Sequence, residues 1–377
     1  MLISDEKTSI KNLSGFRTDI KNLFDGWKAA HYVQEENVFP AEFLKALREI
    51  DALDALLSRE EGGLDLCRTP EGGLVLMTLL RRTGYVSLSL GRCLEGHVNV
   101  VRLVELYGTY EQRRAFARLL QSGILAGIWV TDGVPPVTIR QENGQYRLAG
   151  IKGFASGVRH VSVALITATT QDGHSIMLLA PTTEPNRRRA GPGTLTGMQA
   201  SGTGAYDFTD VIISSDHILG SAGDYLRQPE FSAGAWRGSA VALGAIDRLI
   251  DLLRQELLER GRADNPHQLS RIGEALILQK TAAMWVEQAA KAAYAPRMTP
   301  EDVVAIVNLA RLAVERAALE LITLVQRSLG LSAFVKGKAV EQVMRDLMTY
   351  LRQPAPDEAL TDAAAWFVDH DWPEESL

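Results

Sequence analysis

The chain has 377 residues, of which 46% are hydrophobic and 23% are charged, so it contains enough apolar material for two or three packed domains. Its net charge of −6 argues against a nucleic-acid-binding protein, because neutralising phosphates requires a basic face. No apolar run could span a bilayer, and residues 1–20 contain no signal-peptide core, so we expect no membrane insertion. Only Cys67 and Cys93 are present, without CxxC spacing, which predicts buried thiols and a cytoplasmic location.

Helical periodicity dominates the first third of the chain. Apolar residues three and four apart predict a helix over residues 39–57, with Pro40 in its first turn. Further helices are predicted over residues 74–90, 98–107 and 111–120. Thr109 and Gln112 have the spacing of a capping box for the last of these. We therefore expect an all-α domain over residues 1–125.

The stretch over residues 127–220 has an extended rather than a helical pattern. Residues 161–170 are mostly apolar or β-branched, residues 171–173 (Gln-Asp-Gly) predict a turn, and residues 175–180 are apolar again. Upstream, Asn143-Gly144 between two short runs is a strong hairpin signal. The pattern predicts an antiparallel, β-barrel-like domain over residues 126–222.

The rest of the chain again has helical periodicity. Four helices are predicted over residues 237–260, 269–294, 301–329 and 338–352, each followed by glycine or proline. These spacings favour an antiparallel four-helix bundle over residues 223–377. Residues 240–246 and 305–313 are apolar around much of the helix, more than one core requires, so we expect a homodimer or homotetramer.

Few residues stand out chemically by themselves. The histidines show no metal-ligand spacing, so no metal is expected, and no nucleophile elbow or HExxH motif occurs. His97 and Asn99 lie near a predicted helix start and are candidate substrate contacts, although His97 suits capping or packing equally well. The three arginines at residues 187–189 suit either a solvated loop or a contact to a substrate phosphate.

Four segments, taken in order, resemble the acyl-CoA dehydrogenase family over nearly the whole chain. They are residues 107–112 (YGTYEQ), 129–133 (WVTDG), 152–157 (KGFASG) and 197–220, which ends in Leu-Gly. The second segment lacks the proline that the family usually has there. The resemblance implies the same order of helical domain, β-domain and four-helix bundle, with FAD bound between the β-domain and the bundle.

The resemblance also implies which residues contact the flavin. Trp129 and Thr131 would flank the ring, Ala155 and Ser156 would approach its reactive face, and Phe154 is a further stacking candidate. Such residues suit a flavin, because hydroxyl and N–H groups stabilise the charge of the reduced ring and an aromatic side chain stacks on it. Core packing for the aromatic residues and strand-end hydrogen bonds for the hydroxyls are the alternatives.

In the family, an arginine of a neighbouring subunit contacts the FAD diphosphate. By helix position this arginine is Arg260, with Arg262 as second choice, and a guanidinium suits a diphosphate. The aromatic-glycine pair that usually follows that arginine is absent here.

The position of the family's catalytic base is also implied. A glutamate following the arginine–aspartate pair (here residues 345–346) usually removes the α-proton, and that position is Pro354. Some relatives use a place that corresponds to Gly234. The nearest carboxylates, Asp357 and Glu358, are therefore the candidate catalytic residues, with helix capping as the alternative. We expect weak or no dehydrogenation of ordinary straight-chain acyl-CoAs.

These observations predict an FAD-dependent oxidoreductase that acts on the CH–CH group of an acyl thioester such as an acyl-CoA. Two alternatives are a flavin-dependent monooxygenase of the same fold, which needs no carboxylate base, and a non-catalytic relative that binds flavin or acyl groups. Colour after purification separates the last from the other two. Reduction by an acyl-CoA without an added reductase separates the first from the second.

Overall fold

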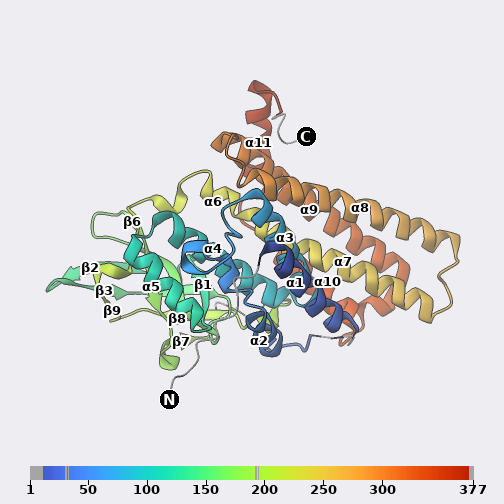
Figure 1. Ribbon diagram of the computed structural model, residues 1–377. Coiled ribbons are helices and arrows are strands. Elements are labelled where there is room, and N and C mark those ends of the chain that lie inside the picture. The colour runs from blue at the N-terminus through green and yellow to red at the C-terminus, as the bar shows by residue number, and fades with distance from the viewer. Residues whose placement is uncertain (1–11, 30–31, 33, 192, 194, 373–377) are drawn as a thin grey trace, which may run out of the picture.

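The computed structural model describes residues 12–29, 32, 34–191, 193 and 195–372, and the polar start and acidic end of the chain lie outside these ranges. A β-sheet region lies at one end of the molecule, long helices lie at the other, and the N-terminal helices lie between them (Figure 1). The predicted order of helices, β-structure and helices is confirmed. The domain boundaries at residues 125 and 222 stay predictions.

The N-terminal part is helical, with boundaries that differ from those predicted. Its helices are α1 (Leu13–Ala29), α2 (Ala41–Glu49), α3 (Pro70–Val86), α4 (Leu88–Tyr107) and α5 (Tyr110–Gln121). The helix predicted over residues 39–57 is too long, because α2 ends at Glu49, and α1 was not predicted. The helix predicted over residues 74–90 is two helices, since the Ser87 hydroxyl accepts the Leu90 N–H and starts α4. The capping box of Thr109 and Gln112 is confirmed.

The middle part is a mixed sheet. Its strands are β1 (Leu125–Trp129), β2 (Thr138–Glu142), β3 (Gln145–Ala149), β4 (Ile151–Ala155), β5 (Val161–Thr169), β6 (Ser175–Pro181), β7 (Arg188–Arg189), β8 (Gly204–Asp207), β9 (Ile212–Ile213) and β10 (Ile218–Leu219). One sheet has the order β10-β6-β5-β2-β3-β9 with β1 beside β5, and a second has the order β4-β8-β7. Both predicted hairpins, β2–β3 and β5–β6, are confirmed. Most strand pairs are antiparallel, as predicted, but β5 pairs in parallel with β1 and β2, because periodicity does not encode strand direction.

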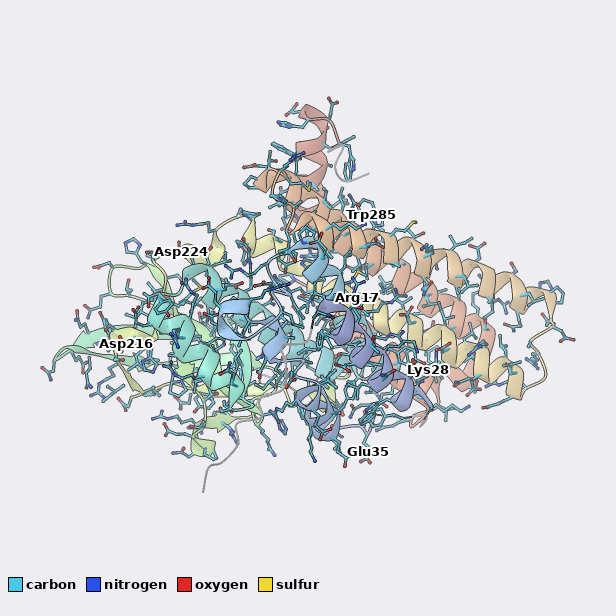
Figure 2. The ribbon with its side chains drawn as sticks, viewed as in Figure 1. Arg17, Lys28, Glu35, Asp216, Asp224 and Trp285 are labelled. Atoms are coloured by element: carbon cyan, nitrogen blue, oxygen red, sulfur yellow. The ribbon has the colours of Figure 1, made fainter. Side chains whose placement is uncertain are left out.

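The C-terminal part contains the four predicted bundle helices. They are α7 (Ala235–Glu259), α8 (Pro266–Ala292), α9 (Pro300–Leu329) and α10 (Ala339–Tyr350). A short helix, α6 (Glu230–Ala233), precedes them, and α11 (Pro356–Asp369), which was not predicted, stands out from the bundle (Figure 1). Trp285 of α8 lies near the base of α11 and makes an edge contact with Trp372 beyond it (Figure 2).

Close helix contacts join the N-terminal part to the bundle. A Cβ on Gly84 of α3 would lie 2.0 Å from the Val241 carbonyl oxygen, and one on Gly244 of α7 would lie 1.9 Å from the Arg81 carbonyl oxygen. Only glycine permits this approach of α3 to α7. The Lys28 ammonium, at the end of α1, lies 2.6 Å from the Asp251 carboxylate of α7 (Figure 2). These contacts hold α1 and α3 against α7 of the bundle.

Both cysteines are free and buried, as predicted. Burial raises the pKa of Cys67 to about 11 and that of Cys93 to about 12, so both are protonated thiols at neutral pH. The cytoplasmic location stays a prediction.

Within the described residues, no single helix is both long and apolar enough to cross a membrane. Residues Pro300–Phe334 and Ala339–Tyr350 meet that test only as a pair, which is bent by 118°.

Candidate functional site

Two cavities meet between the sheet region, α4 and the bundle. The first, here called the Phe154 cavity, has a volume of ≈ 730 Å³ and is lined by Phe154, Ser156, Met198, Thr203, Phe334 and Arg345, among others. The second, here called the Arg237 cavity, has a volume of ≈ 800 Å³ and is lined by Asn99, Thr131, Gly234, Arg237, Arg311 and Glu358, among others. Arg92, Tyr350 and Gln353 line both cavities, so the two are adjacent.

The wall of the Phe154 cavity carries an aromatic ring that the protein leaves partly uncovered. Phe154 is 49% exposed, and its φ of +48° lies in the left-handed region. The pairing of β4 with β8 is irregular between Lys152 and Ala155, and a bulge of this kind redirects a side chain. Ser156 lies on the same wall, 3.4 Å from the Thr203 hydroxyl. Of the two residues predicted at the ring's reactive face, Ser156 lines this cavity, whereas Ala155 is buried and lines neither cavity; the stacking candidate Phe154 lines this cavity too.

Trp129 lies behind this wall rather than on it. Its side chain is buried, and its indole N–H donates to the Ser156 carbonyl oxygen at 3.1 Å. It lines neither cavity. The prediction that Trp129 flanks a bound ring is therefore corrected: the side chain packs in the core and holds the backbone that carries Ser156.

A buried lysine joins the two predicted flavin loops. The ammonium of Lys152, which is 0% exposed, donates to the Val130 carbonyl at 3.0 Å, to the Asp132 carboxylate at 2.6 Å and to the Thr167 hydroxyl at 3.1 Å. Burial lowers the pKa of Lys152, and the Asp132 carboxylate opposes that shift. Thr131, which lies between Val130 and Asp132 in the first loop, lines the Arg237 cavity. The role of Lys152 was missed, although a charged residue in an otherwise apolar strand is a usable signal.

His97 and Asn99, the two predicted substrate contacts, lie on different faces of α4. His97 lies in the middle of α4, not at its start, and is fully buried, with Nδ1 accepting the Ala126 N–H at 3.0 Å. Burial lowers the pKa of His97 to about 4, so the ring is neutral at pH 7. It lines neither cavity, which corrects its predicted substrate contact. Asn99 does line the Arg237 cavity, where its amide oxygen accepts from Arg237 at 2.6 Å.

A buried polar cluster lies where the two cavities meet, and sequence reasoning missed it. Glu95 of α4 accepts from the Arg92 guanidinium at 2.8 Å and from the Tyr350 hydroxyl at 3.1 Å. The Glu95 charge raises the pKa of Arg92, and burial raises the pKa of Tyr350, so a charged guanidinium lies beside a neutral phenol. The two participating helices are far apart in sequence, which is why no local pattern indicated the cluster.

The predicted base positions all lie near the Arg237 cavity. Gly234 and Pro354 line it, and the Pro354 carbonyl accepts from Arg311 at 2.7 Å. Glu358, in the first turn of α11, lines the same cavity, whereas Asp357 lines neither. Neither carboxylate caps α11, whose N-cap residue is Ala355 without a side-chain hydrogen bond. Of the two candidates, only Glu358 shares a cavity with Thr131 and Asn99.

Segment 197–220 is fixed to the bundle through the arginine–aspartate pair. The Asp346 carboxylate accepts the Met198 N–H at 2.6 Å, and burial raises the pKa of Asp346 to about 6. The Arg345 guanidinium donates to the Thr196 carbonyl at 2.6 Å. A Cβ on Gly197 would lie 2.4 Å from the Arg345 carbonyl oxygen, so this close contact requires glycine. These contacts place Met198 on the wall of the Phe154 cavity.

The remaining candidates lie elsewhere. Arg260 lies at the end of α7, where it pairs with Glu256 and donates to the Ser332 hydroxyl at 2.6 Å, and it lines neither cavity of its own chain. Arg187 donates to the Thr209 carbonyl at 2.6 Å and Arg189 pairs with Asp207 at 3.1 Å, which indicates a loop-holding role. Within the described part of the chain, no group of three or more histidine, cysteine or acidic side chains could hold a metal ion.

Comparison with curated proteins gives two kinds of relative, although no family model matches the chain. The chain is 24% identical over 245 residues to the probable acyl-CoA dehydrogenase FadE10 of Mycobacterium tuberculosis, a match that covers 60% of this chain and 37% of that protein. It is 26% identical over 254 residues to the acryloyl-CoA reductase (NADH) of Anaerotignum propionicum, covering 63% of each. The chain thus spans less than two thirds of the length of either relative.

Solved structures of similar fold cover nearly the whole chain. Dibenzothiophene monooxygenase (TdsC) from a Paenibacillus species aligns with a TM-score of 0.82 at 19% identity, covering 95% of this chain and 98% of that one. A glutaryl-coenzyme A dehydrogenase complex aligns with a TM-score of 0.81 at 18% identity, covering 99% and 97%. Butyryl-CoA dehydrogenase from Megasphaera elsdenii aligns with a TM-score of 0.81 at 15% identity, covering 97% and 100%. The predicted acyl-CoA dehydrogenase-like fold is confirmed.

Proposed function

This chain is a divergent member of the acyl-CoA dehydrogenase family, and from that premise we propose that it is a flavin-dependent oxidoreductase acting on the CH–CH group of an acyl thioester. One observation carries the proposal: the fold brings Thr131, from a predicted flavin loop, and Glu358, from the end of the chain, to one cavity. The Phe154 cavity adjoins it across Arg92 and Tyr350. This adjacency supports a cofactor site in one cavity and a substrate site in the other.

The residues of the Phe154 cavity fit a flavin ring. Phe154 and Phe334 are 49% and 57% exposed on its wall, and a flat conjugated ring would cover such apolar surface. Ser156 supplies a hydroxyl on this wall, and Thr131, which lines the adjoining Arg237 cavity, supplies a second; both would hydrogen-bond the polar edge of a ring that lies where the two cavities meet. A bound flavin supplies the hydride acceptor that the chain's own side chains lack.

We propose FAD rather than FMN as the cofactor. The support is Arg260, whose guanidinium lies at the far end of the bundle and would contact the diphosphate of FAD bound to a second copy of the chain. Reconstitution of the protein with each cofactor in separate samples tests this choice. Equal retention of FMN and FAD after gel filtration would contradict it.

Changing Thr131 to Val should weaken flavin binding by about 1 kcal/mol, because one hydrogen bond is lost while the shape of the side chain is kept. Titration of flavin fluorescence against the apoprotein measures the effect. The matched control is Thr78→Val on α3, a residue that lines neither cavity and should leave the affinity unchanged. A protein that stays colourless after reconstitution with excess FAD would sink the cofactor proposal altogether.

The proposed reaction is tested by anaerobic mixing of the flavin-loaded protein with acyl-CoA thioesters while the flavin absorbance is followed. Glu358 would accept the α-proton, and the β-hydride would pass to the flavin. Bleaching of the flavin without an added reductase supports the dehydrogenase proposal. We expect ordinary straight-chain thioesters to react weakly, because Pro354 and Gly234 offer no carboxylate.

A flavin-dependent monooxygenase is the second candidate. The absence of a carboxylate at Pro354 and Gly234 favours it. A monooxygenase needs no carboxylate base. The structure of dibenzothiophene monooxygenase aligns with this chain as well as the dehydrogenase structures do. Oxygen consumption that requires a separate supply of reduced flavin would favour this candidate. A flavin that neither thioesters nor oxygen affect would instead indicate a non-catalytic relative.

We further propose that the chain forms a homo-oligomer, although not through the residues first considered. Residues 240–246 are all buried within the chain's own core, and so are six of the nine residues 305–313, which accounts for most of their apolar character. The exposed apolar stripe lies instead on α8, at Leu269, Leu276, Ile277 and Met284. Residues seven and eight positions apart share one helix face, and a stripe of this kind is typical of an interface.

Sedimentation velocity at micromolar concentration should therefore show a dimer or tetramer. Ile277→Glu should shift the distribution toward the monomer, because a charge would be buried in the interface. The control Glu274→Lys changes a charged residue of the same helix that lies two positions before Leu276 and not on the face of Leu276, and it should have a smaller effect. A wild-type protein that sediments only as a 41.3 kDa monomer would contradict the proposal.

A further inference from the structure

Arg237 is a buried cation on a cavity wall without an acidic partner. Its side chain is 4% exposed, and its guanidinium donates to the Asn99 amide oxygen at 2.6 Å and to the Tyr294 hydroxyl at 3.1 Å. Both acceptors are uncharged, and the buried Nε has no hydrogen-bond partner. Among the ion pairs of the described residues, none includes Arg237, and the Glu230 carboxylate, which acts on its charge from farther away, is itself paired with Arg102.

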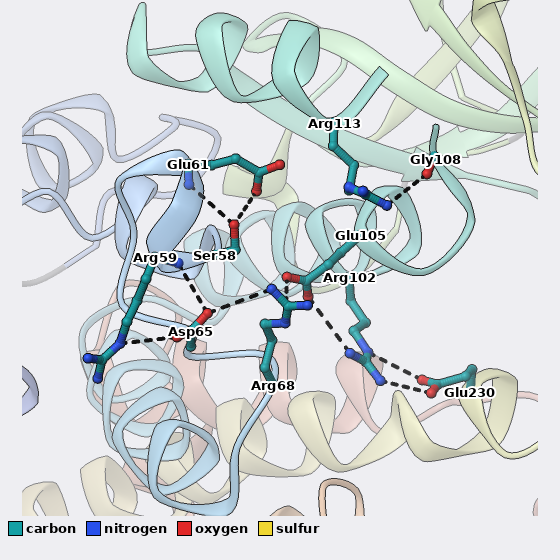
Figure 3. Close-up of polar contacts among 10 residues, drawn as sticks. All are labelled: Ser58, Arg59, Glu61, Asp65, Arg68, Arg102, Glu105, Gly108, Arg113 and Glu230. Atoms are coloured by element: carbon teal, nitrogen blue, oxygen red, sulfur yellow. Dashed lines mark hydrogen bonds and ion pairs between the residues drawn. The ribbon is translucent and has the colours of Figure 1, made fainter. Parts of the chain in front are cut away.

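Arg102 and Glu230, which line the Arg237 cavity, belong to a network of arginines and carboxylates that pair with one another (Figure 3). Arg102 pairs with Glu230 at 2.9 Å and with Glu105 at 3.7 Å. Glu105 also pairs with Arg68 at 3.2 Å, and Asp65 pairs with Arg59 at 3.1 Å. Three arginines thus face three carboxylates, Asp65, Glu105 and Glu230. The charge of Arg237 is an excess over this balanced network.

The other charged groups of the Arg237 cavity do not supply the missing anion. Arg92 is paired with Glu95 at 2.8 Å, and Glu315 is paired with Arg352 at 2.5 Å. Glu358 and Asp362 lie on α11 and are exposed to solvent. Arg311 donates to the Pro354 carbonyl and adds a second cation without a carboxylate in hydrogen-bond contact. The acids that remain unpaired are therefore solvated, whereas the unpaired cation of α7 is buried.

Space for a ligand lies directly beside the guanidinium. Gly234 lines the cavity one turn before Arg237, and a Cβ at Gly234 would already lie 3.4 Å from Nη1 of Arg237. A larger side chain there would occupy the space next to the charge. An ionised group taken out of water without a counter-charge is costly, and arginine binds a carboxylate through paired, charge-assisted hydrogen bonds.

We propose that Arg237 forms an anion-binding subsite for a carboxylate at the end of the acyl group, so that the preferred substrates are ω-carboxyacyl thioesters. This inference rests on the proposed action on acyl thioesters. Asn99 and Tyr294 hold the guanidinium in place, and Gly234 leaves room for the ligand. A methyl-ended chain of the same length would leave the buried cation without its counter-charge.

The test compares two coenzyme A thioesters of equal chain length, one ending in a carboxylate and one in a methyl group, on the flavin-loaded protein. The carboxylate-ended thioester should bind about 10-fold to 100-fold more tightly, as expected for a hydrogen-bonded charge pair. Arg237→Met should abolish the preference, and Arg237→Lys should retain part of it. Tyr294→Phe removes a hydrogen bond but no charge, so it should affect both thioesters alike. Arg237→Lys also keeps the test decisive if Arg237→Met fails to fold.

The outcomes separate this inference from the proposed function. Equal binding of the two thioesters, or a preference that survives in Arg237→Met, would overturn the carboxylate subsite while leaving the dehydrogenase proposal in place. If neither thioester binds, the proposed function fails. The subsite is then tested by the rise in melting temperature that a short carboxylate causes, compared with the rise caused by the alcohol of equal length. Equal rises would overturn the subsite.

Discussion

Replacing Glu358 by Gln should lower the rate of flavin reduction by about 10²–10⁴-fold, because a positioned general base typically contributes that much. The measurement is a stopped-flow trace of flavin bleaching with whichever thioester reduces the wild-type protein. Glutamine keeps the size of the side chain and removes only its ability to take a proton. Substrate affinity should change little, since Glu358 is exposed at the edge of the Arg237 cavity.

Asp357 provides the matched control for that experiment. It precedes Glu358 in the first turn of α11 but lines neither cavity, so Asp357→Asn should reduce the flavin at nearly the wild-type rate. Both variants lose one negative charge at the N-terminal end of α11. The lost interaction with the helix dipole is therefore the same in both and cancels when their rates are compared. Wild-type rates of about 10 s⁻¹ that persist in both variants would show that the base lies elsewhere.

Replacing Asp132 by Ala should destabilise the protein by about 3 kcal/mol, because it leaves the fully buried Lys152 ammonium with only neutral acceptors. Urea unfolding of the apoprotein at pH 7 measures this loss. The carboxylate also accepts the Val137 N–H at 3.0 Å, so part of the loss comes from that hydrogen bond.

The pH dependence of that loss identifies its cause. Burial lowers the folded-state pKa of Lys152 below its ordinary value of 10.5, so the unfolded chain binds the proton more tightly between the two values. Stability therefore rises with pH across that window. In Asp132→Ala the folded pKa falls further, and the deficit relative to wild type should shrink as the pH approaches 10.5. A deficit that stays constant from pH 7 to that value would mean that Asp132 acts through packing alone.

A double-mutant cycle separates the ion pair from its surroundings. Lys152→Met keeps the length of the stem and removes the charge, and in that background Asp132→Ala should cost much less than in the wild-type protein. Equal costs in the two backgrounds would argue against a direct interaction. Because the pair joins the loops that carry Thr131 and Phe154, its loss should also weaken flavin binding.

Several local elements of this protein were determined by the sequence alone, because each of them depends on neighbours in the chain. The 3.6-residue period predicted the four bundle helices, Asn143-Gly144 predicted the β2–β3 hairpin, and Thr109 with Gln112 formed the expected capping box. The order of helical and extended regions, together with short motifs, was sufficient to identify the fold.

Only the tertiary structure decided which side chains reach a cavity. Trp129 and Phe154 both lie in strand segments, yet one is buried and the other faces the Phe154 cavity, because a strand irregularity redirects the second. His97 and Asn99 are two residues apart, and the turn of α4 sends one into the core and the other to Arg237. The burial of a side chain and its hydrogen-bond partners depend on which segments meet in space. Periodicity along the chain does not indicate which distant segments pack together.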